Sequence, residues 1–190
     1  MAEPNAKTRE RLVAGAADMI RRRGLSATSV RELAKHSGAP LGSTYHYFPG
    51  GKQQLATEAV EFAGDTIART LDRALERGPL EGLRAFLATW RKTITSADFR
   101  AGCPVLAVSI EDSADTAALD AAADVFARWE SLLERSLRRH GAGRAEARQI
   151  ATLTVASIEG TVALCRAKRS AQPLDRIRPQ LEALIVHATS

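Results

Sequence analysis

The chain has 190 residues, of which 45% are hydrophobic and 26% are charged, and its net charge is +5. This length suffices for two small domains with a shared core, and the composition excludes a largely disordered chain. The charge is uneven, because residues 1–52 hold nine Lys and Arg against four Asp and Glu, whereas the remainder is neutral. A basic N-terminal segment favours a polyanionic partner such as DNA for that segment.

The first predicted helix runs from about residue 6 to residue 23, and Gly24 ends it. Its apolar residues recur at helical spacing: Leu12, Val13, Ala16, Ala17 and Ile20. A second helix begins at Ser29, which forms a capping box with Glu32, and it stops just before Gly38. A third helix follows within a few residues. This spacing is typical of a helix-turn-helix unit, which places its second helix in the major groove of DNA.

The third predicted helix, about residues 40–47, is poor in bulky aliphatic side chains and begins with a proline, which suits a first helical turn. Ser43, Tyr45 and His46 offer hydrogen bonds to phosphates or base edges. Gly42 would let the backbone approach DNA closely. These residue types predict that this helix contacts DNA rather than filling the core.

Lys52 follows in the first turn of the next predicted helix, where a bound phosphate would meet both its charge and free backbone N–H groups. Tyr47 and Phe48 are instead expected to fill the small core of the helix-turn-helix unit. The complete set of expected DNA-binding residues is Ser29, Arg31, Pro40, Leu41, Gly42, Ser43, Tyr45, His46 and Lys52.

Residues 7–60 resemble the N-terminal signature of the TetR/AcrR family of transcription regulators. The matching residues are Ser29, Ala34, Gly38, Gly42, Ser43, Tyr45, Tyr47, Phe48 and Lys52. Two features depart from that signature: Pro40 and Leu41 stand where the family usually has Ser and Lys, and Thr44 replaces an aliphatic residue. The segments 49–52 and 102–105 are similar to the LmrA/YxaF-like branch. The resemblance implies a non-enzymatic, homodimeric, ligand-responsive repressor.

The rest of the chain shows helical periods and almost no strand pattern, so we expect an all-α fold of nine helices. The remaining predicted helices span about residues 52–77, 80–94, 104–111, 115–139, 144–168 and 175–188, and Pro179 complicates the start of the last one. The seventh helix has a long apolar stripe: Leu119, Ala122, Val125, Phe126, Trp129, Leu132, Leu133 and Leu137. We expect a DNA-binding domain over residues 1–60 and an effector-binding and dimerisation domain over residues 61–190.

The eighth predicted helix is unusually apolar, since Glu159 is the one charged residue between positions 150 and 165. Such a helix must be covered on most sides, partly by a second subunit. The resemblance implies a dimer built from the eighth and ninth helices, the latter contributing Ile177, Leu181, Leu184, Ile185 and His187. Twofold symmetry then predicts a roughly palindromic operator.

The resemblance also implies an effector cavity between the fourth and eighth helices. The candidate lining residues are Phe62, Phe86, Trp90, Phe99, Cys103, Leu106, Phe126, Trp129, Val155 and Glu159. Their aromatic content would suit a small apolar or aromatic molecule, although each residue alone is more typical of ordinary core, and only the resemblance favours a cavity for the group. Glu111 and Glu159 could meet a cationic group of the ligand, or Glu159 could instead be a structural partner for a backbone or Arg group near the dimer interface.

Three alternatives remain open at this point. Cys103, at a predicted helix start, could act in a redox-responsive regulator, or could be a small buried hydrophobe. A helical adaptor could use the helix-turn-helix for protein contacts without binding DNA. An enzyme is disfavoured, because the four histidines lack metal-ligand spacing and no nucleophile or phosphate-loop motif occurs. We expect no cofactor, no metal and no transmembrane helix, and a cytoplasmic protein.

Overall fold

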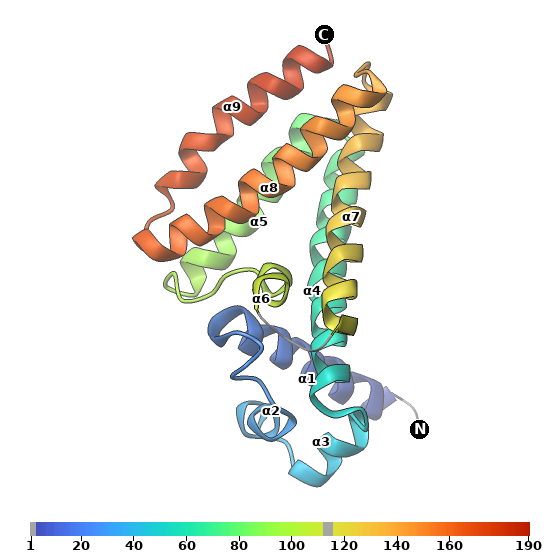
Figure 1. Ribbon diagram of the computed structural model, residues 1–190, viewed down its shortest axis with the longest axis vertical. Coiled ribbons are helices and arrows are strands. Elements are labelled where there is room, and N and C mark those ends of the chain that lie inside the picture. The colour runs from blue at the N-terminus through green and yellow to red at the C-terminus, as the bar shows by residue number, and fades with distance from the viewer. Residues whose placement is uncertain (1–2, 112–115) are drawn as a thin grey trace. The chain divides into compact units, whose positions relative to one another are not determined.

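The computed structural model describes residues 3–111 and 116–190, and within them the chain forms nine helices and no strand (Figure 1). The all-α expectation is therefore confirmed. The helices are α1 (Glu3–Arg23), α2 (Val30–Ser37), α3 (Leu41–Tyr47), α4 (Gly51–Leu75), α5 (Pro79–Ser96), α6 (Pro104–Ile110), α7 (Thr116–Arg139), α8 (Arg144–Lys168) and α9 (Gln172–Ala188).

The chain divides into two compact units. Unit 1 comprises the residues up to Gly64 together with Cys103–Val125, and unit 2 comprises Asp65–Gly102 together with Phe126–Ser190. Helices α4 and α7 each contribute to both units. Sequence patterns did not predict that α6 and the first part of α7 join the N-terminal unit. The functional division at residue 60 stays a prediction.

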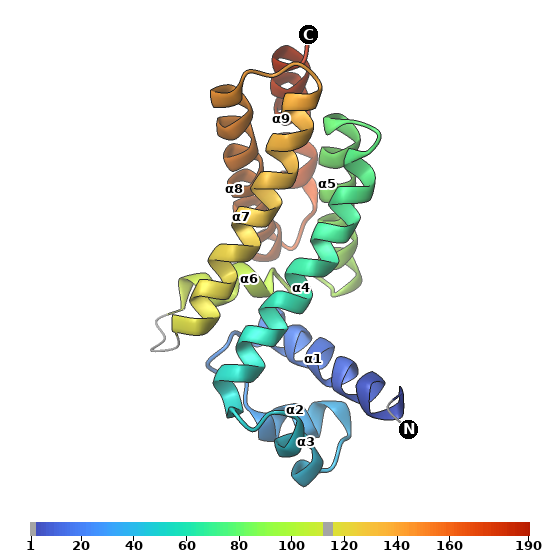
Figure 2. The same cartoon turned by 90° about the vertical axis from the view of Figure 1, so that its right-hand side faces the viewer.

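In unit 1, α1 packs against α2 and α6, and α2 packs against α3 (Figure 2). The expected apolar stripe of α1 is buried, and Leu33 of α2, Phe48 and Leu55 of α4 are fully buried beside it. Gly64 of α4 lies so close to Val125 of α7 that a Cβ at position 64 would overlap the valine side chain. This unit therefore has a continuous apolar core that holds the helix-turn-helix.

In unit 2, α8 and α9 lie side by side as an antiparallel pair, and α5 packs against both (Figure 1). Helix α8 has the predicted bounds. Helix α9 begins at Gln172, three residues earlier than expected, because Pro173 occupies its first turn, where a proline needs no N–H partner. Pro179 then lies inside the helix, so it does not mark its start.

The start of α7 corrects one expected core residue. The predicted first position, 115, lies outside the described residues, and Leu119 has 46% of its surface exposed. The buried positions of this part of the helix follow an i, i+3, i+4, i+7 pattern: Ala118, Ala121, Ala122 and Val125. Leu119 is rotated about 100° from Ala118 around the helix axis and therefore faces outward.

Among the described helices, α8 alone is long and apolar enough by composition to cross a membrane, and 50% of its most apolar window is buried within the fold. Buried core helices of folded domains show the same pattern. Leu153 and Leu164 of α8 remain exposed, at 46% and 50% of their surfaces.

Candidate nucleic-acid interface

Capping residues fix both ends of α2, the first helix of the helix-turn-helix. The Ser29 hydroxyl accepts a hydrogen bond from the Glu32 backbone N–H at 3.1 Å, as the capping pattern predicts. At the other end, Gly38 adopts the left-handed conformation with φ 62°, and its N–H donates to carbonyls of the last turn. The predicted start, stop and turn of this helix are confirmed.

Helix α3 presents most of its surface to solvent. Leu41 and Tyr45 have 38% and 50% of their surfaces exposed, and Gly42, Ser43 and His46 are also exposed. A Cβ at Gly42 would meet no other atom within 4 Å, so the space over this backbone is open. The structure thus brings these five expected DNA-binding residues together on one accessible helix.

Pro40 precedes α3 instead of lying in its first turn, which corrects the expected helix start. It is the N-cap residue, with extended backbone angles (φ −60°, ψ 133°). Its carbonyl accepts hydrogen bonds from the Thr44 backbone N–H at 3.1 Å and from the Ser43 and Thr44 hydroxyls at 3.0 Å. The Thr44 hydroxyl is thereby satisfied although its side chain is fully buried, which explains how a threonine can replace an aliphatic residue here.

The end of α3 is anchored by contacts that sequence reasoning missed. Phe48 is fully buried, as expected, whereas Tyr47 is half-buried. The Arg9 guanidinium lies 5.8 Å from the centre of the Phe48 ring and pairs with the Glu58 carboxylate at 2.6 Å. Gln54 links Glu58 to the Gly50 backbone, through bonds of 2.8 and 2.9 Å. These contacts fix the turn between α3 and α4.

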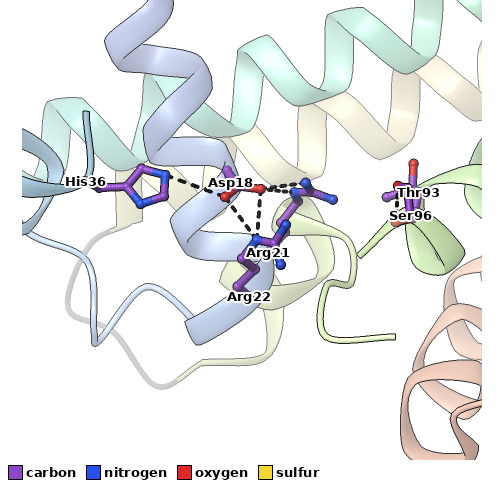
Figure 3. Close-up of polar contacts among 6 residues, drawn as sticks. All are labelled: Asp18, Arg21, Arg22, His36, Thr93 and Ser96. Carbon is purple, nitrogen blue, oxygen red and sulfur yellow. Dashed lines mark hydrogen bonds and ion pairs between the residues drawn. The ribbon is translucent and has the colours of Figure 1, made fainter. Parts of the chain in front are cut away.

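Part of the basic charge of unit 1 is already paired within the unit (Figure 3). The Asp18 carboxylate accepts hydrogen bonds from Arg21 at 2.8 Å and from Arg22 at 3.0 Å, and His36 of α2 lies 3.6 Å away. Partial burial alone would raise the pKa of Asp18, but the hydrogen bonds and charges of Arg22 and Arg21 lower it below its usual value. Two of the three consecutive arginines therefore have a structural role.

Lys52 lies in the first turn of α4, as expected, and its side chain is exposed. Its ammonium group donates to the Ser26 backbone carbonyl at 3.4 Å. Arg31, on α2, is exposed, and Ser29 is half-buried by its capping role. Thus Lys52 and Arg31 are cations available on the same unit as α3.

Glu111, at the end of α6, contacts the connection between α1 and α2. One carboxylate oxygen accepts from the Leu25 N–H at 2.7 Å, and the other accepts from the Ser26 N–H at 2.9 Å and the Ser26 hydroxyl at 2.7 Å. Burial alone would raise the pKa of Glu111, but these hydrogen bonds and the charge of Lys52 lower it. In this structure its oxygens are occupied by these donors, and the expected role of Glu111 toward a cationic ligand stays a prediction.

The expected effector-binding residues belong to both units, and we describe those of unit 2 first. The Trp129 ring meets Phe86 and Phe126 edge-to-face, with ring centres 5.6 Å apart in both pairs. Trp90 lies one turn beyond Phe86 on α5; it is buried, and its indole N–H has no hydrogen-bond partner within the described structure. Val155 and Glu159 are buried one turn apart on α8, and Phe99 is half-buried.

Phe62, Cys103 and Leu106 belong to unit 1. Cys103 is the buried N-cap of α6, and its Sγ accepts from the Leu106 N–H at 3.5 Å. Cys165 is also buried and free, and burial raises the pKa of its thiol, so the neutral form is favoured. A redox role for Cys103 stays a prediction.

Unit 2 has two described cavities, and none of the expected effector-binding residues lines either of them. One, of about 370 Å³, lies between α5 and α9 and is lined by Arg84, Leu87, Ala88, Arg91, Leu174, Asp175 and Arg178. The other, of about 410 Å³, lies between α4 and α7 and is lined by Asp65, Ala68, Arg69, Asp72, Arg128, Leu132 and Arg135. Ion pairs join Arg91 to Asp175 and Arg128 to Asp65 across these hollows.

Comparison with known proteins identifies relatives over nearly the whole chain. Residues 12–59 match the family of bacterial regulatory proteins called the tetR family, and residues 79–180 match the C-terminal domain of LmrA/YxaF-like transcriptional regulators. A Mycobacterium tuberculosis protein named as an uncharacterised HTH-type transcriptional regulator is 42% identical over 184 residues, covering 94% of each chain. LmrA, an HTH-type transcriptional regulator of Bacillus subtilis, is 32% identical over 170 residues, covering 88% of this chain and 90% of LmrA.

A solved structure has the same fold. The crystal structure of a TetR transcriptional regulator from Legionella pneumophila superimposes with a TM-score of 0.82 at 20% identity, covering 91% of this chain and 94% of the other.

Proposed function

Because the chain belongs to the TetR family of DNA-binding transcription regulators, in its LmrA/YxaF-like branch, we propose that it is a homodimeric repressor released by a small effector. The family regulates transcription and is not enzymatic. In this proposal residues 1–60 bind DNA, residues 61–190 bind the effector and the second subunit, and the protein acts in the cytoplasm.

The exposed helix α3 is the observation that carries the DNA-binding part of the proposal. Tyr45, half exposed, together with Ser43 and His46, would contact base edges, and the exposed Lys52 would meet a phosphate. Leu41, where the family usually has a lysine, has 38% of its surface exposed and could contact a thymine methyl group instead. We therefore propose the expected set from Ser29 to Lys52 as the DNA-binding residues.

The exposed apolar residues of α8 and α9 support a dimer. Leu153 and Leu164 of α8 and Leu184 and Val186 of α9 each have 39–50% of their surfaces exposed, on two helices that pack side by side. Removing such side chains from water favours association with the same surface of a second copy. A twofold dimer would carry two α3 helices and would bind a palindromic operator with half-sites about one helical turn apart.

The aromatic cluster of Phe86, Phe126 and Trp129 supports an apolar or aromatic effector. The Trp90 indole N–H, buried without a partner among the described residues, would be satisfied by a hydrogen-bond acceptor on that molecule. Effector binding would alter α4, which runs through both units, and would change the spacing of the two α3 helices. A coupling of about 1–3 kcal/mol or more would suffice for release.

The proposal can be tested by selecting genomic DNA fragments with the purified protein and measuring their affinity by fluorescence anisotropy at several salt concentrations. We expect enrichment of a palindrome, a steep decrease of affinity with salt, and a dimer in analytical ultracentrifugation. Tyr45→Ala should alter the preferred sequence, whereas Lys92→Ala, which removes an exposed cation of α5, should not. A flat salt dependence would favour the protein-binding adaptor, and a monomer would contradict the palindrome.

A further inference from the structure

We propose that Glu111 is a positioning residue for DNA binding: from the end of α6 it holds the connection between α1 and α2, and through Ser26 it holds Lys52. This inference rests on the proposed DNA-binding function and assigns a new residue to it. All the residues involved belong to unit 1.

The Glu111 carboxylate accepts hydrogen bonds from backbone N–H groups that have no backbone acceptor in the connection between α1 and α2. The chain leaves α1 at Arg23 and enters α2 at Val30, so the Leu25 and Ser26 N–H groups have no intrahelical acceptor. Glu111 accepts both, at 2.7 and 2.9 Å, together with the Ser26 hydroxyl at 2.7 Å. One side chain therefore satisfies three donors of a segment 85 residues away along the chain.

Gly24 makes this contact possible. Its φ of 84° lies in the left-handed region, and a Cβ at this position would overlap Glu111 Oε1. The backbone at Gly24 is thus shaped to admit the carboxylate. The Thr28 hydroxyl donates to the Gly24 carbonyl at 2.9 Å and closes the connection from its other side.

The same connection holds Lys52. The Lys52 ammonium donates to the Ser26 carbonyl at 3.4 Å, on the residue whose N–H and hydroxyl are bound by Glu111. The negative charge of Glu111 also attracts Lys52, because the two groups interact electrostatically. This contact fixes where the ammonium lies before DNA arrives. Without Glu111 we expect the Lys52 side chain to miss its phosphate, so that one phosphate contact per subunit is lost from the salt slope.

The test is the salt dependence of operator affinity for Glu111→Ala, Lys52→Ala and the double variant. We expect Lys52→Ala to reduce the slope of log affinity against log salt concentration by about one unit per subunit. At 0.1 M salt, relative to 1 M, this is about an eightfold loss of affinity per half-site. Glu111→Ala should reduce the slope similarly, and the double variant should lose no more than Lys52→Ala. Glu61→Ala, which removes an exposed carboxylate of α4 in the same unit, is the matched control and should leave the slope unchanged.

A merely structural role for Glu111 would lower the fraction of folded protein and the apparent affinity without changing the slope. An unchanged slope in Glu111→Ala would overturn the inference. So would a double variant whose slope falls by the sum of the reductions seen in Glu111→Ala and Lys52→Ala. If Glu111→Ala does not fold by circular dichroism, Ser26→Ala removes only one of the three hydrogen bonds and should reduce the slope by a fraction of a unit; no change there would also overturn it. Absence of salt-dependent binding in the unaltered protein would instead refute the proposed function.

Discussion

Replacing Gly24 with alanine should destabilise the protein more than the same replacement at Gly38, although both glycines are left-handed. The φ angles are 84° and 62°, so either alanine costs about 1–2 kcal/mol in backbone strain. At Gly38 a Cβ meets nothing within 4 Å, and strain is the whole cost. At Gly24 the Cβ would displace the Glu111 carboxylate, which is the free end of a flexible side chain and can move.

The additional cost at Gly24 is therefore the loss of the hydrogen bonds that Glu111 makes. Leaving the buried Leu25 without a partner for its N–H costs about 1–2 kcal/mol, and the two bonds to exposed Ser26 contribute less. The expected totals are about 2–4 kcal/mol for Gly24→Ala and about 1–2 kcal/mol for Gly38→Ala.

Urea unfolding followed by circular dichroism, at one fixed protein concentration, measures both values. In a Glu111→Ala background, Gly24→Ala should cost only the strain, about 1–2 kcal/mol. Equal costs at the two glycines, or an undiminished cost in that background, would refute this account.

Three further outcomes are expected. In nonspecific DNA binding, measured by anisotropy on random duplexes, Lys52→Ala should flatten the salt dependence by about one unit per subunit, whereas Lys92→Ala should match the unaltered protein. Leu164→Glu should convert the proposed dimer to a monomer in analytical ultracentrifugation, because it places a charge in an apolar contact; a persistent dimer would exclude this face. Because the pKa of Asp18 is lowered in the native state, its contribution to stability is present above about pH 4 and is lost as the pH falls further. Asp18→Asn should reduce that acid dependence in unfolding measured from pH 5 to pH 2.5, and an unaltered dependence would contradict the assignment.

Helix bounds could be predicted wherever one residue determines them. Ser29 caps the start of α2 and Gly38 ends it, so the pattern and the structure agree. For α9 the sequence pattern predicts a start three residues too late. Pro179 is tolerated within the helix, and Pro173, in the first turn, is the better start signal. The apolar character of Leu119 predicts a core position, but the neighbouring Ala118 is the buried residue.

The candidate site could be predicted only where its residues lie close together in the sequence. The exposed residues of α3 follow from the helix-turn-helix pattern, whereas Glu111 and Arg9 act on segments 85 and 49 residues away. A single sequence does not indicate which distant side chains meet. The one local trace of the Glu111 contact is Gly24, whose place in the sequence predicts only a helix stop.

The aromatic residues of the chain are distributed so that each unit has its own spectroscopic probe. Both tryptophans, Trp90 and Trp129, belong to unit 2, and both tyrosines, Tyr45 and Tyr47, belong to α3 of unit 1. Selectively excited tryptophan emission would therefore follow unit 2 alone, without any label. Fluorotyrosine incorporated biosynthetically would give nuclear resonances from α3 alone, so binding at the two units can be observed separately in one sample.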